Sequence, residues 1–178
     1  EWRMLPAAER TSKYHGGRYG FCCPNNQGYR QFAHAQIGEL TAGYDFDGLF
    51  IDMTFWPRIC LCEHCRARYR AETGAEIPRV IDWFDPGWCR FQAARERWMV
   101  EFACELSDRA KQPNPALSVY HNFATSGSNW TLGLSFRAAE ANDFLGADFY
   151  GDPLEQLVVS KLMTNLSPNR PIEFMTSR

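Results

Sequence analysis

The sequence has 178 residues, of which 45% are hydrophobic and 15% aromatic, so it is long and apolar enough for a folded domain with a core and unlike a disordered chain. The formal net charge of −2 gives no electrostatic reason to expect a nucleic acid or an anionic membrane as partner. No apolar run reaches the roughly 18 residues that cross a bilayer and no signal-peptide pattern is present, so we expect no membrane partner.

The first part of the chain predicts a loop, a helix and a strand. Residues 1–19 read as loop. Residues 29–44 carry an apolar stripe at helical spacing. The stripe consists of Ala33, Ile37, Leu40 and Tyr44. The short apolar run 48–51 is bounded by polar residues, which is typical of a buried parallel strand, and Asp52 follows it directly.

Residues 57–88 are predicted to leave this pattern as an excursion with little core of its own. The excursion contains a cysteine-rich loop, a short helix over 66–72 ended by Gly74, and a segment rich in Pro, Asp and Trp. The regular pattern then resumes with a long helix over 89–111, which Pro113 stops. Strands are expected at 117–122, 144–150 and 171–176, a loop at 126–129, and helices at 136–141 and 153–166.

This alternation of helices and strands predicts an α/β fold with a parallel sheet and right-handed crossovers. A polar loop follows each expected strand, as in the repeating unit of a (β/α)8 (TIM) barrel. Such a barrel typically needs about 250 residues. We therefore expect residues 1–178 to be a single domain that is a fragment of a barrel, covering about its fourth to seventh βα units. A complete flavodoxin-like sheet is the alternative, but it would require an early phosphate loop, and none is visible.

Three cysteines are crowded into six positions: Cys60, Cys62 and Cys65. A C-x-C-x-x-C loop suits tetrahedral zinc, because one loop can supply three thiolates about 2.3 Å from the ion. The fourth ligand is expected from Cys22 or Cys23 on a preceding loop, with His64 a weaker candidate; free thiols are the alternative. Four cysteines would close the coordination sphere, so the Zn²⁺ would be structural and not catalytic. Clustered reduced thiols also favour a cytoplasmic location.

Polar side chains at the predicted strand ends form a candidate active site. Asp52 lies where α/β folds bind their ligands, although it could instead cap the next helix. As a catalytic carboxylate Asp52 needs a second carboxylate about 5 to 9 Å away, and Asp148 is the best placed. Four further residues are candidates for binding a substrate: His121, Asn122, Tyr150 and Glu173.

Several segments carry a resemblance to a known family. They are CPNNQGYR at 23–30, FDGLFID at 46–52, CLCEHCRARY at 60–69, ETG at 72–74 and FMTSR at 174–178. With these motifs the chain resembles the group named hypothetical glycosyl hydrolase 6, which is similar to the α-L-fucosidase and family 42 β-galactosidase barrels. The resemblance covers most of the chain and implies a glycosidase barrel with a carbohydrate substrate.

The resemblance also implies roles for particular residues. Family 42 enzymes hold zinc with one cysteine on an earlier loop and a C-x-C-x-x-C run past the fourth strand, which here implies Cys23, rather than Cys22, with the three cysteines of 60–65. Fucosidases place an aspartate nucleophile at the end of the fourth strand, which implies Asp52. The Asn-Glu pair of family 42 is absent, and Thr176 stands where that family has its nucleophilic Glu.

These observations lead to two hypotheses about function. The first is a retaining glycoside hydrolase in which Asp52 is the nucleophile and Asp148 is the candidate acid. The second is an inactive carbohydrate-binding barrel, because the catalytic residues of family 42 are missing. Neither the sugar nor the oligomeric state follows from the sequence, and a homo-oligomer is left open.

Overall fold

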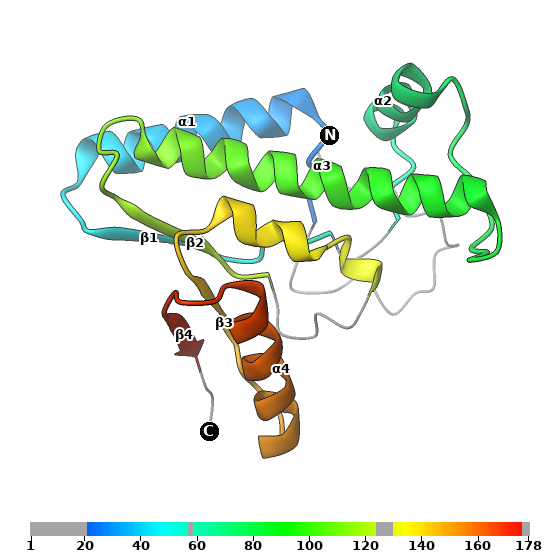
Figure 1. The fold of residues 1–178 in the computed structure, drawn as a ribbon. Helices are drawn as coiled ribbons and strands as arrows, with labels where there is room; N and C mark the ends of the chain where they lie inside the picture. Colours follow the sequence, from blue (N-terminus) through cyan, green and yellow to red (C-terminus); the bar gives the residue numbers. More distant parts are fainter. Residues whose placement is uncertain (1–20, 57–58, 124–129, 176–178) are drawn as a thin grey trace.

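The computed structural model describes residues 21–56, 59–123 and 130–175, in which each of the four strands is separated from the next by one or two helices (Figure 1). The helices are α1 (Gln27–Gly43), α2 (Glu63–Thr73), α3 (Pro86–Lys111) and α4 (Pro153–Leu166). The strands are β1 (Gly48–Ile51), β2 (Ser118–His121), β3 (Leu145–Asp148) and β4 (Ile172–Met175). Two 3-10 helices, η2 (Trp130–Leu132) and η3 (Phe136–Ala141), lie between β2 and β3, and η3 is the short helix expected at 136–141.

Local sequence signals explain where the helices begin and end. Asp85 caps α3 by accepting a hydrogen bond from the backbone N–H of Gly87 at 2.8 Å, and Pro86 occupies the first turn, where no N–H is needed. Asp152 and Glu155 form a capping box at the start of α4. Gly74 ends α2 in the left-handed conformation, with φ of 71°.

The strands form two parallel pairs, β1 with β2 and β3 with β4. The expected continuous sheet is therefore interrupted, and the described part of the chain shows no closed barrel. The interruption has a physical cause at the outer edge of β2, where side chains take the place of a neighbouring strand. Asn142 Oδ1 accepts from the His121 N–H at 2.6 Å, and Asp143 Oδ2 accepts from the Val119 N–H at 2.7 Å.

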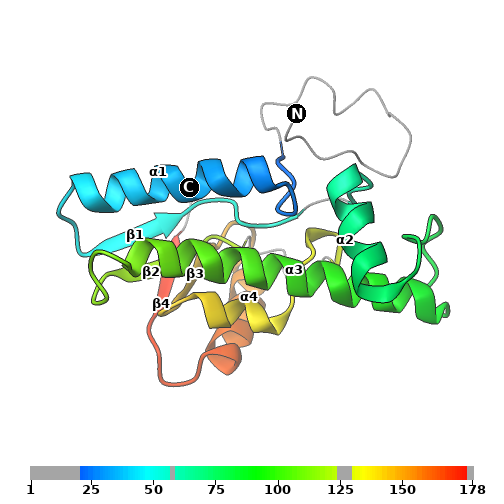
Figure 2. The same ribbon diagram turned by 90° about the horizontal axis from the view of Figure 1, so that it is seen from above.

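Helices α1 and α3 lie side by side over one face of β1 and β2 (Figures 1 and 2). The expected apolar face of α3 is buried, and it comprises Met99, Phe102, Leu106 and Ala110. The stripe expected on α1 is only partly correct, because Ile37 is buried whereas Leu40 and Tyr44 are 44% and 69% exposed. The contact with α3 instead includes the His34 carbonyl, which accepts a hydrogen bond from Arg109 Nε at 3.2 Å.

The excursion has more core than the sequence predicted. Tyr69 is buried and packs edge to face on Phe91 of α3, with ring centroids 5.3 Å apart, and Trp83 packs in the same way on Trp88 in the first turn of α3, 6.0 Å away. Trp83, at its tip, packs on Trp130 of η2 at 5.4 Å. Aromatic contacts thus join the excursion to α3 and to the loop that follows β2.

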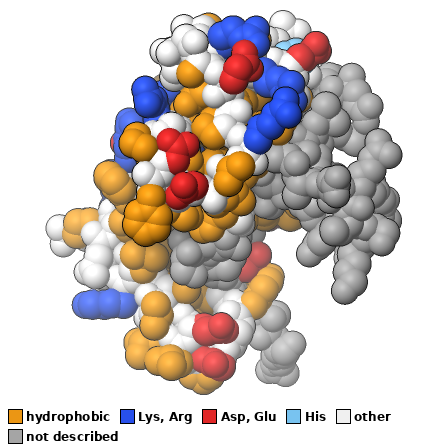
Figure 3. All heavy atoms as spheres, turned by 90° about the vertical axis from the view of Figure 1, so that its right-hand side faces the viewer, with side chains coloured by type: hydrophobic (Ala, Val, Ile, Leu, Met, Phe, Trp, Pro, Cys, Tyr) orange, Lys and Arg blue, Asp and Glu red, His pale blue; other side chains and the backbone are white. Residues whose placement is uncertain are grey.

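Helix α4 has no buried residue. Its exposed apolar side chains are Leu154, Leu157, Val158 and Leu162. Figure 3 shows apolar side chains gathered at the bottom of the molecule, where α4 lies in Figure 1. In the described ranges no helix is both long and apolar enough to cross a bilayer.

Candidate active site and metal centre

Two candidate residues, Asp52 and Asn122, share one face of β1 and β2 because side chains alternate along a strand. The Phe50 ring contacts the Tyr120 ring across β1 and β2, with centroids 4.8 Å apart, so both side chains point to the same face. Asp52 and Asn122 follow two residues later on that face. Parallel strands end at the same edge of a sheet, and this places Asp52 and Asn122 side by side.

Asn122 brings Asp52 together with Asp148. Its amide nitrogen donates to Asp52 Oδ1 at 2.9 Å and to Asp148 Oδ2 at 3.2 Å. The two oxygens therefore lie no farther apart than the sum of these distances, about 6 Å. Asn122 is 2% exposed, whereas Asp52 is exposed. The result is an accessible carboxylate whose orientation is set by a buried amide.

Aromatic rings form a floor beneath this site. The ring of Tyr120 lies 4.8 Å from Phe50 and 4.6 Å from Phe144. Gly146 leaves room for the Tyr120 ring, because a Cβ at position 146 would lie 2.7 Å from it. Burial, and then a hydrogen bond with Glu173, raise the pKa of Tyr120 well above its usual range.

Neither Glu173 nor Tyr150 lies level with Asp148 along the strands: Glu173 lies before it and Tyr150 after it. Glu173 is opposite Gly146 in the register of β3 and β4, two residues before Met175, which is opposite Asp148. Glu173 thus engages Tyr120 in the floor and not the carboxylate pair. Tyr150, 48% exposed, lies past the end of β3, and its hydroxyl is 3.9 Å from Met175 Sδ.

His121 points away from Asn122, into the helical side of β2. It is 0% exposed, and its two ring nitrogens lie 2.9 Å from Ser107 Oγ and 2.8 Å from Thr54 Oγ1. Burial lowers the pKa of His121 to about 4, so the ring is neutral at pH 7. With both nitrogens engaged inside the protein, His121 is not placed to touch a substrate.

A buried arginine ties together the loops that follow β1 and β2. Arg95 of α3 is 0% exposed and donates to the Trp56 carbonyl at 3.2 Å and to the Thr131 carbonyl at 3.0 Å. Burial lowers its pKa to about 10, which still leaves it charged at neutral pH. The Trp56 N–H also donates to the Leu132 carbonyl at 2.7 Å. These bonds fix one rim of the site to the long helix.

A pocket of about 230 Å³ lies beside Asp52 but faces the helices. Its walls include Tyr29 of α1 and Phe102 and Leu106 of α3, and neither Asn122 nor Asp148 lines it. The pocket and the carboxylate pair therefore share Asp52 but no other member of the Asp52–Asn122–Asp148 arrangement. The carboxylate pair is the better guide to chemistry, because it combines two acids within reach of one reacting group.

The structure also brings together four buried cysteines: Cys23, Cys60, Cys62 and Cys65. All four sulfur atoms lie within 4.8 Å of one another, and those of Cys23, Cys62 and Cys65 are 3.3 to 3.6 Å apart. Tetrahedral ligation at 2.3 Å requires sulfurs about 3.8 Å apart, so the arrangement fits a metal ion. Cys23 joins the cluster and Cys22 does not, in agreement with what the family resemblance implied; His64 is also outside it.

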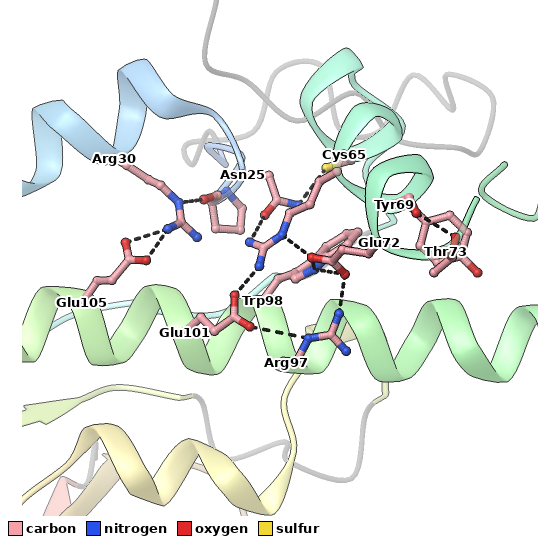
Figure 4. Close-up of polar contacts among 12 residues, drawn as sticks. Asn25, Arg30, Cys65, Tyr69, Glu72, Thr73, Arg97, Trp98, Glu101 and Glu105 are labelled. Atoms are coloured by element: carbon pink, nitrogen blue, oxygen red, sulfur yellow. Dashed lines mark hydrogen bonds and ion pairs between the residues drawn. The ribbon is translucent and has the colours of Figure 1, made fainter. Parts of the chain in front are cut away.

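Polar side chains around the cysteines complete the site (Figure 4). The Asn25 amide donates to Cys65 Sγ at 3.5 Å and accepts from Arg68 at 2.9 Å. Arg68 also pairs with Glu72 and Glu101. Hydrogen bonds among the four sulfurs shift the pKa values in both directions, lowering that of Cys62 and raising those of Cys23 and Cys65. Donors directed at sulfur stabilise thiolates, the form that binds metal.

Sequence reasoning missed Asn25, Arg68 and Thr54. Asn25 was visible as part of the segment 23–30, but nothing local showed that its amide would reach Cys65 across 40 positions. Arg68 lies in the segment 60–69, and its partner Glu101 is on another helix. Their roles depend on how α1, α2 and α3 pack, which spacing alone does not give.

Comparison with known proteins identifies the fold. The β-galactosidase of Rahnella sp. R3 matches 92% of this chain with a TM-score of 0.67 and 20% identity, and the match covers 30% of the galactosidase. The α-L-fucosidase isoenzyme 2 of Paenibacillus thiaminolyticus matches 82% of the chain with a TM-score of 0.53 and 19% identity, covering 20% of the fucosidase. No family model and no curated protein sequence matches.

The fold is therefore glycosidase-like, and the chain spans less than a third of these two proteins. At 19 to 20% identity the likeness establishes the fold and not the activity. Function must be argued from the residues of the site.

Proposed function

We propose that this chain contributes part of the active site of a glycoside hydrolase, within a TIM barrel of which it forms about the fourth to seventh βα units. The similarity to a galactosidase and a fucosidase supports this barrel, although the described strands form only two parallel pairs. The observation that carries the proposal is the Asp52–Asn122–Asp148 arrangement. Hydrolysis of a glycosidic bond needs two carboxylates, and here they stand at the ends of β1 and β3, on either side of the Asn122 that follows β2.

The spacing of the carboxylates favours a retaining mechanism. Retaining enzymes hold their carboxyl groups about 5 to 5.5 Å apart, whereas inverting enzymes leave about 6.5 to 9.5 Å for a water molecule. An upper limit of about 6 Å between Asp52 Oδ1 and Asp148 Oδ2 agrees with the shorter class.

In the first step Asp52 attacks the anomeric carbon. The bond from that carbon to the leaving oxygen breaks, its electron pair moves to the oxygen, and this oxygen takes the proton of Asp148. In the second step Asp148 accepts a proton from water, whose oxygen displaces the Asp52 carboxylate from the sugar. The Asn122 amide donates to both carboxylates and so holds the pair in register through both steps.

The four cysteines would hold a structural Zn²⁺, because a four-thiolate sphere leaves no position open for a substrate. The ion would join Cys23, just before α1, to the excursion through Cys60, Cys62 and Cys65. It would fix one wall of the cleft and take no part in bond breaking.

The test is a screen of 4-nitrophenyl glycosides with the full-length protein, followed by Asp52→Asn and Asp148→Asn. Each change should lower kcat at least about 10³-fold on the best substrate, since each removes a reacting group. Asp47→Asn is the matched control, because Asp47 is exposed and precedes β1, at the opposite end of that strand. Azide added to Asp52→Gly should restore turnover and yield a glycosyl azide of inverted configuration.

Normal turnover by Asp52→Asn would refute the assignment of the nucleophile. A wild-type protein that binds sugars but hydrolyses none of the panel would favour the carbohydrate-binding alternative.

A further inference from the structure

A non-glycine residue in the left-handed conformation directly follows Asp52. Met53 has φ of 59°, a backbone conformation that is strained for a residue with a side chain. Such a conformation persists only where the surroundings hold it in place. The contacts of the next residue, Thr54, show what holds it.

Thr54 is bound to β2 twice. Its N–H donates to the Asn122 carbonyl at 3.1 Å, and its hydroxyl lies 2.8 Å from His121 Nδ1. Thr54 is 5% exposed and His121 is 0% exposed, so water does not compete for these bonds. The turn that carries Asp52 is therefore fastened to the same strand end that presents Asn122.

The direction of each hydrogen bond follows from the number of protons. Ser107 Oγ donates its one proton to the Ala141 carbonyl at 2.7 Å, so it must accept from His121 Nε2–H at 2.9 Å. A neutral imidazole with its proton on Nε2 has a free acceptor at Nδ1, and Thr54 donates to it. The low pKa of His121 agrees with a neutral ring.

We propose that Thr54, His121 and Ser107 form a directed chain of hydrogen bonds that positions the Asp52 carboxylate against Asn122. This inference rests on the proposed function, for which Asp52 is the nucleophile. None of the three is a catalytic residue: they act through the turn at Met53, and none contacts Asp52 by a hydrogen bond among those the described residues form. A displacement of about 1 Å of a reacting group can cost about 10²-fold in rate, so such positioning is measurable.

Two substitutions of Thr54 separate positioning from packing. Thr54→Val keeps the size of the side chain and removes the hydroxyl, whereas Thr54→Ser keeps the hydroxyl and removes a methyl group. Positioning predicts that Thr54→Val lowers kcat on the best 4-nitrophenyl glycoside 10- to 100-fold with KM within about threefold, while Thr54→Ser stays within about threefold of wild type. A merely structural role predicts that Val is tolerated at least as well as Ser, and that result would overturn the inference.

Crystal structures and histidine NMR supply a readout that does not depend on activity. In the wild type, ¹⁵N spectra should show His121 protonated on Nε2 and not on Nδ1. In Thr54→Val the Asp52–Asn122 hydrogen bond should be lost, and in Thr54→Ser it should be kept. If the wild type hydrolyses no glycoside but these structural changes occur, the proposed function fails and the positioning chain stands. If the Asp52–Asn122 hydrogen bond is unchanged in Thr54→Val, the proposed hydrogen-bond chain is refuted, whatever the activity.

If Thr54→Val does not fold, Ser107, at the other end of the hydrogen-bond chain, provides the same comparison. Ser107→Ala leaves His121 Nε2–H without its hydroxyl acceptor, and Ser107→Thr restores one. Positioning requires the Ala variant to lose turnover and the Asp52–Asn122 contact and the Thr variant to retain both; equal behaviour of the two variants would refute it.

Discussion

The cysteine cluster and the carboxylate pair are both built from side chains that lie far apart in the sequence, yet they are held in different ways. The four cysteines are 0 to 6% exposed and belong to the main apolar core. The carboxylates lie at the ends of short strands, and Asp52 is exposed. One site is enclosed by packing, and the other is oriented by hydrogen bonds from a buried amide and a constrained turn.

Because of this difference, we expect substitutions at the cysteines to change mainly the stability of the protein, and substitutions at the carboxylate pair to change mainly its turnover. Changes at the cysteines should act on the free energy of unfolding, because they disturb the core and the proposed metal site together. Changes around Asn122 should act on rate, because they alter where charge is presented while leaving most of the core intact. Four experiments test how complete the separation is.

The largest effect is expected from Cys65→Ser. Loss of a metal thiolate should lower the free energy of unfolding by about 5 kcal/mol or more and abolish zinc binding, since binding of a structural metal contributes directly to folding. Zinc content and chemical denaturation measure the two effects. Cys89→Ser is the matched control, because Cys89 is exposed and outside the cluster. A Cys65→Ser protein with unchanged stability would show that the cluster has no metal-dependent role.

Acidification should destabilise the core through His121, the next largest effect. The folded pKa of about 4 lies below the ordinary value of 6.5, so the unfolded chain binds more protons. The contribution is fully present above pH 6.5 and is lost as the pH falls toward 4, by about 3 kcal/mol.

The side chains that contact the ring, Thr54, Ser107 and Phe123, do not titrate in this range. Denaturation curves of wild type and His121→Gln across this pH range provide the measurement. The slope of stability against pH should be shallower in the variant, and parallel slopes would contradict the assignment to His121.

Replacing the bridging amide should affect turnover more than stability. Asn122→Ala leaves Asp52 and Asp148 facing one another without the donor between them, and kcat should fall about 10²-fold. Zinc content should stay at the wild-type level. Loss of zinc from this variant would show that the two sites are coupled rather than separate.

The smallest effect is expected from Asn25→Ala, which removes the donor to Cys65 but no ligand. Outer contacts of this kind change metal affinity by about 10- to 100-fold, which competition with a chromophoric chelator can measure. Asn114→Ala, at an exposed turn, is the control. An affinity equal to that of wild type would mean that Asn25 orders the loop without tuning the sulfur.

The sequence allowed the cysteine cluster to be predicted because three of its members are neighbours in the chain. The order of helices and strands could also be predicted, since each carries local signals such as the apolar run of β1 or the caps of α3 and α4. The interruption of the sheet was not accessible, because it depends on Asn142 and Asp143 bonding to the edge of β2.

His121 and Asn122 show how a local rule could have improved the prediction. Both were candidates for contact with a substrate, but adjacent residues of a strand point to opposite faces, so only one can face the cleft. Asp52 and Asn122 face the carboxylate site, and His121 therefore faces α3. The left-handed turn at Met53 gave no signal, because methionine is not a residue that sequence rules associate with positive φ.

The tryptophan contacts described for the excursion have a spectroscopic consequence. Trp83, Trp88 and Trp130 lie nearly perpendicular to one another, with ring centroids 5.4 to 6.0 Å apart. Indoles this close couple their electronic transitions, so the trio should give a circular dichroism signal in the near ultraviolet that depends on their mutual orientation. Trp83 belongs to the excursion, Trp88 to the start of α3 and Trp130 to η2, and the protein therefore contains an intrinsic optical reporter of the packing of these three segments on one another.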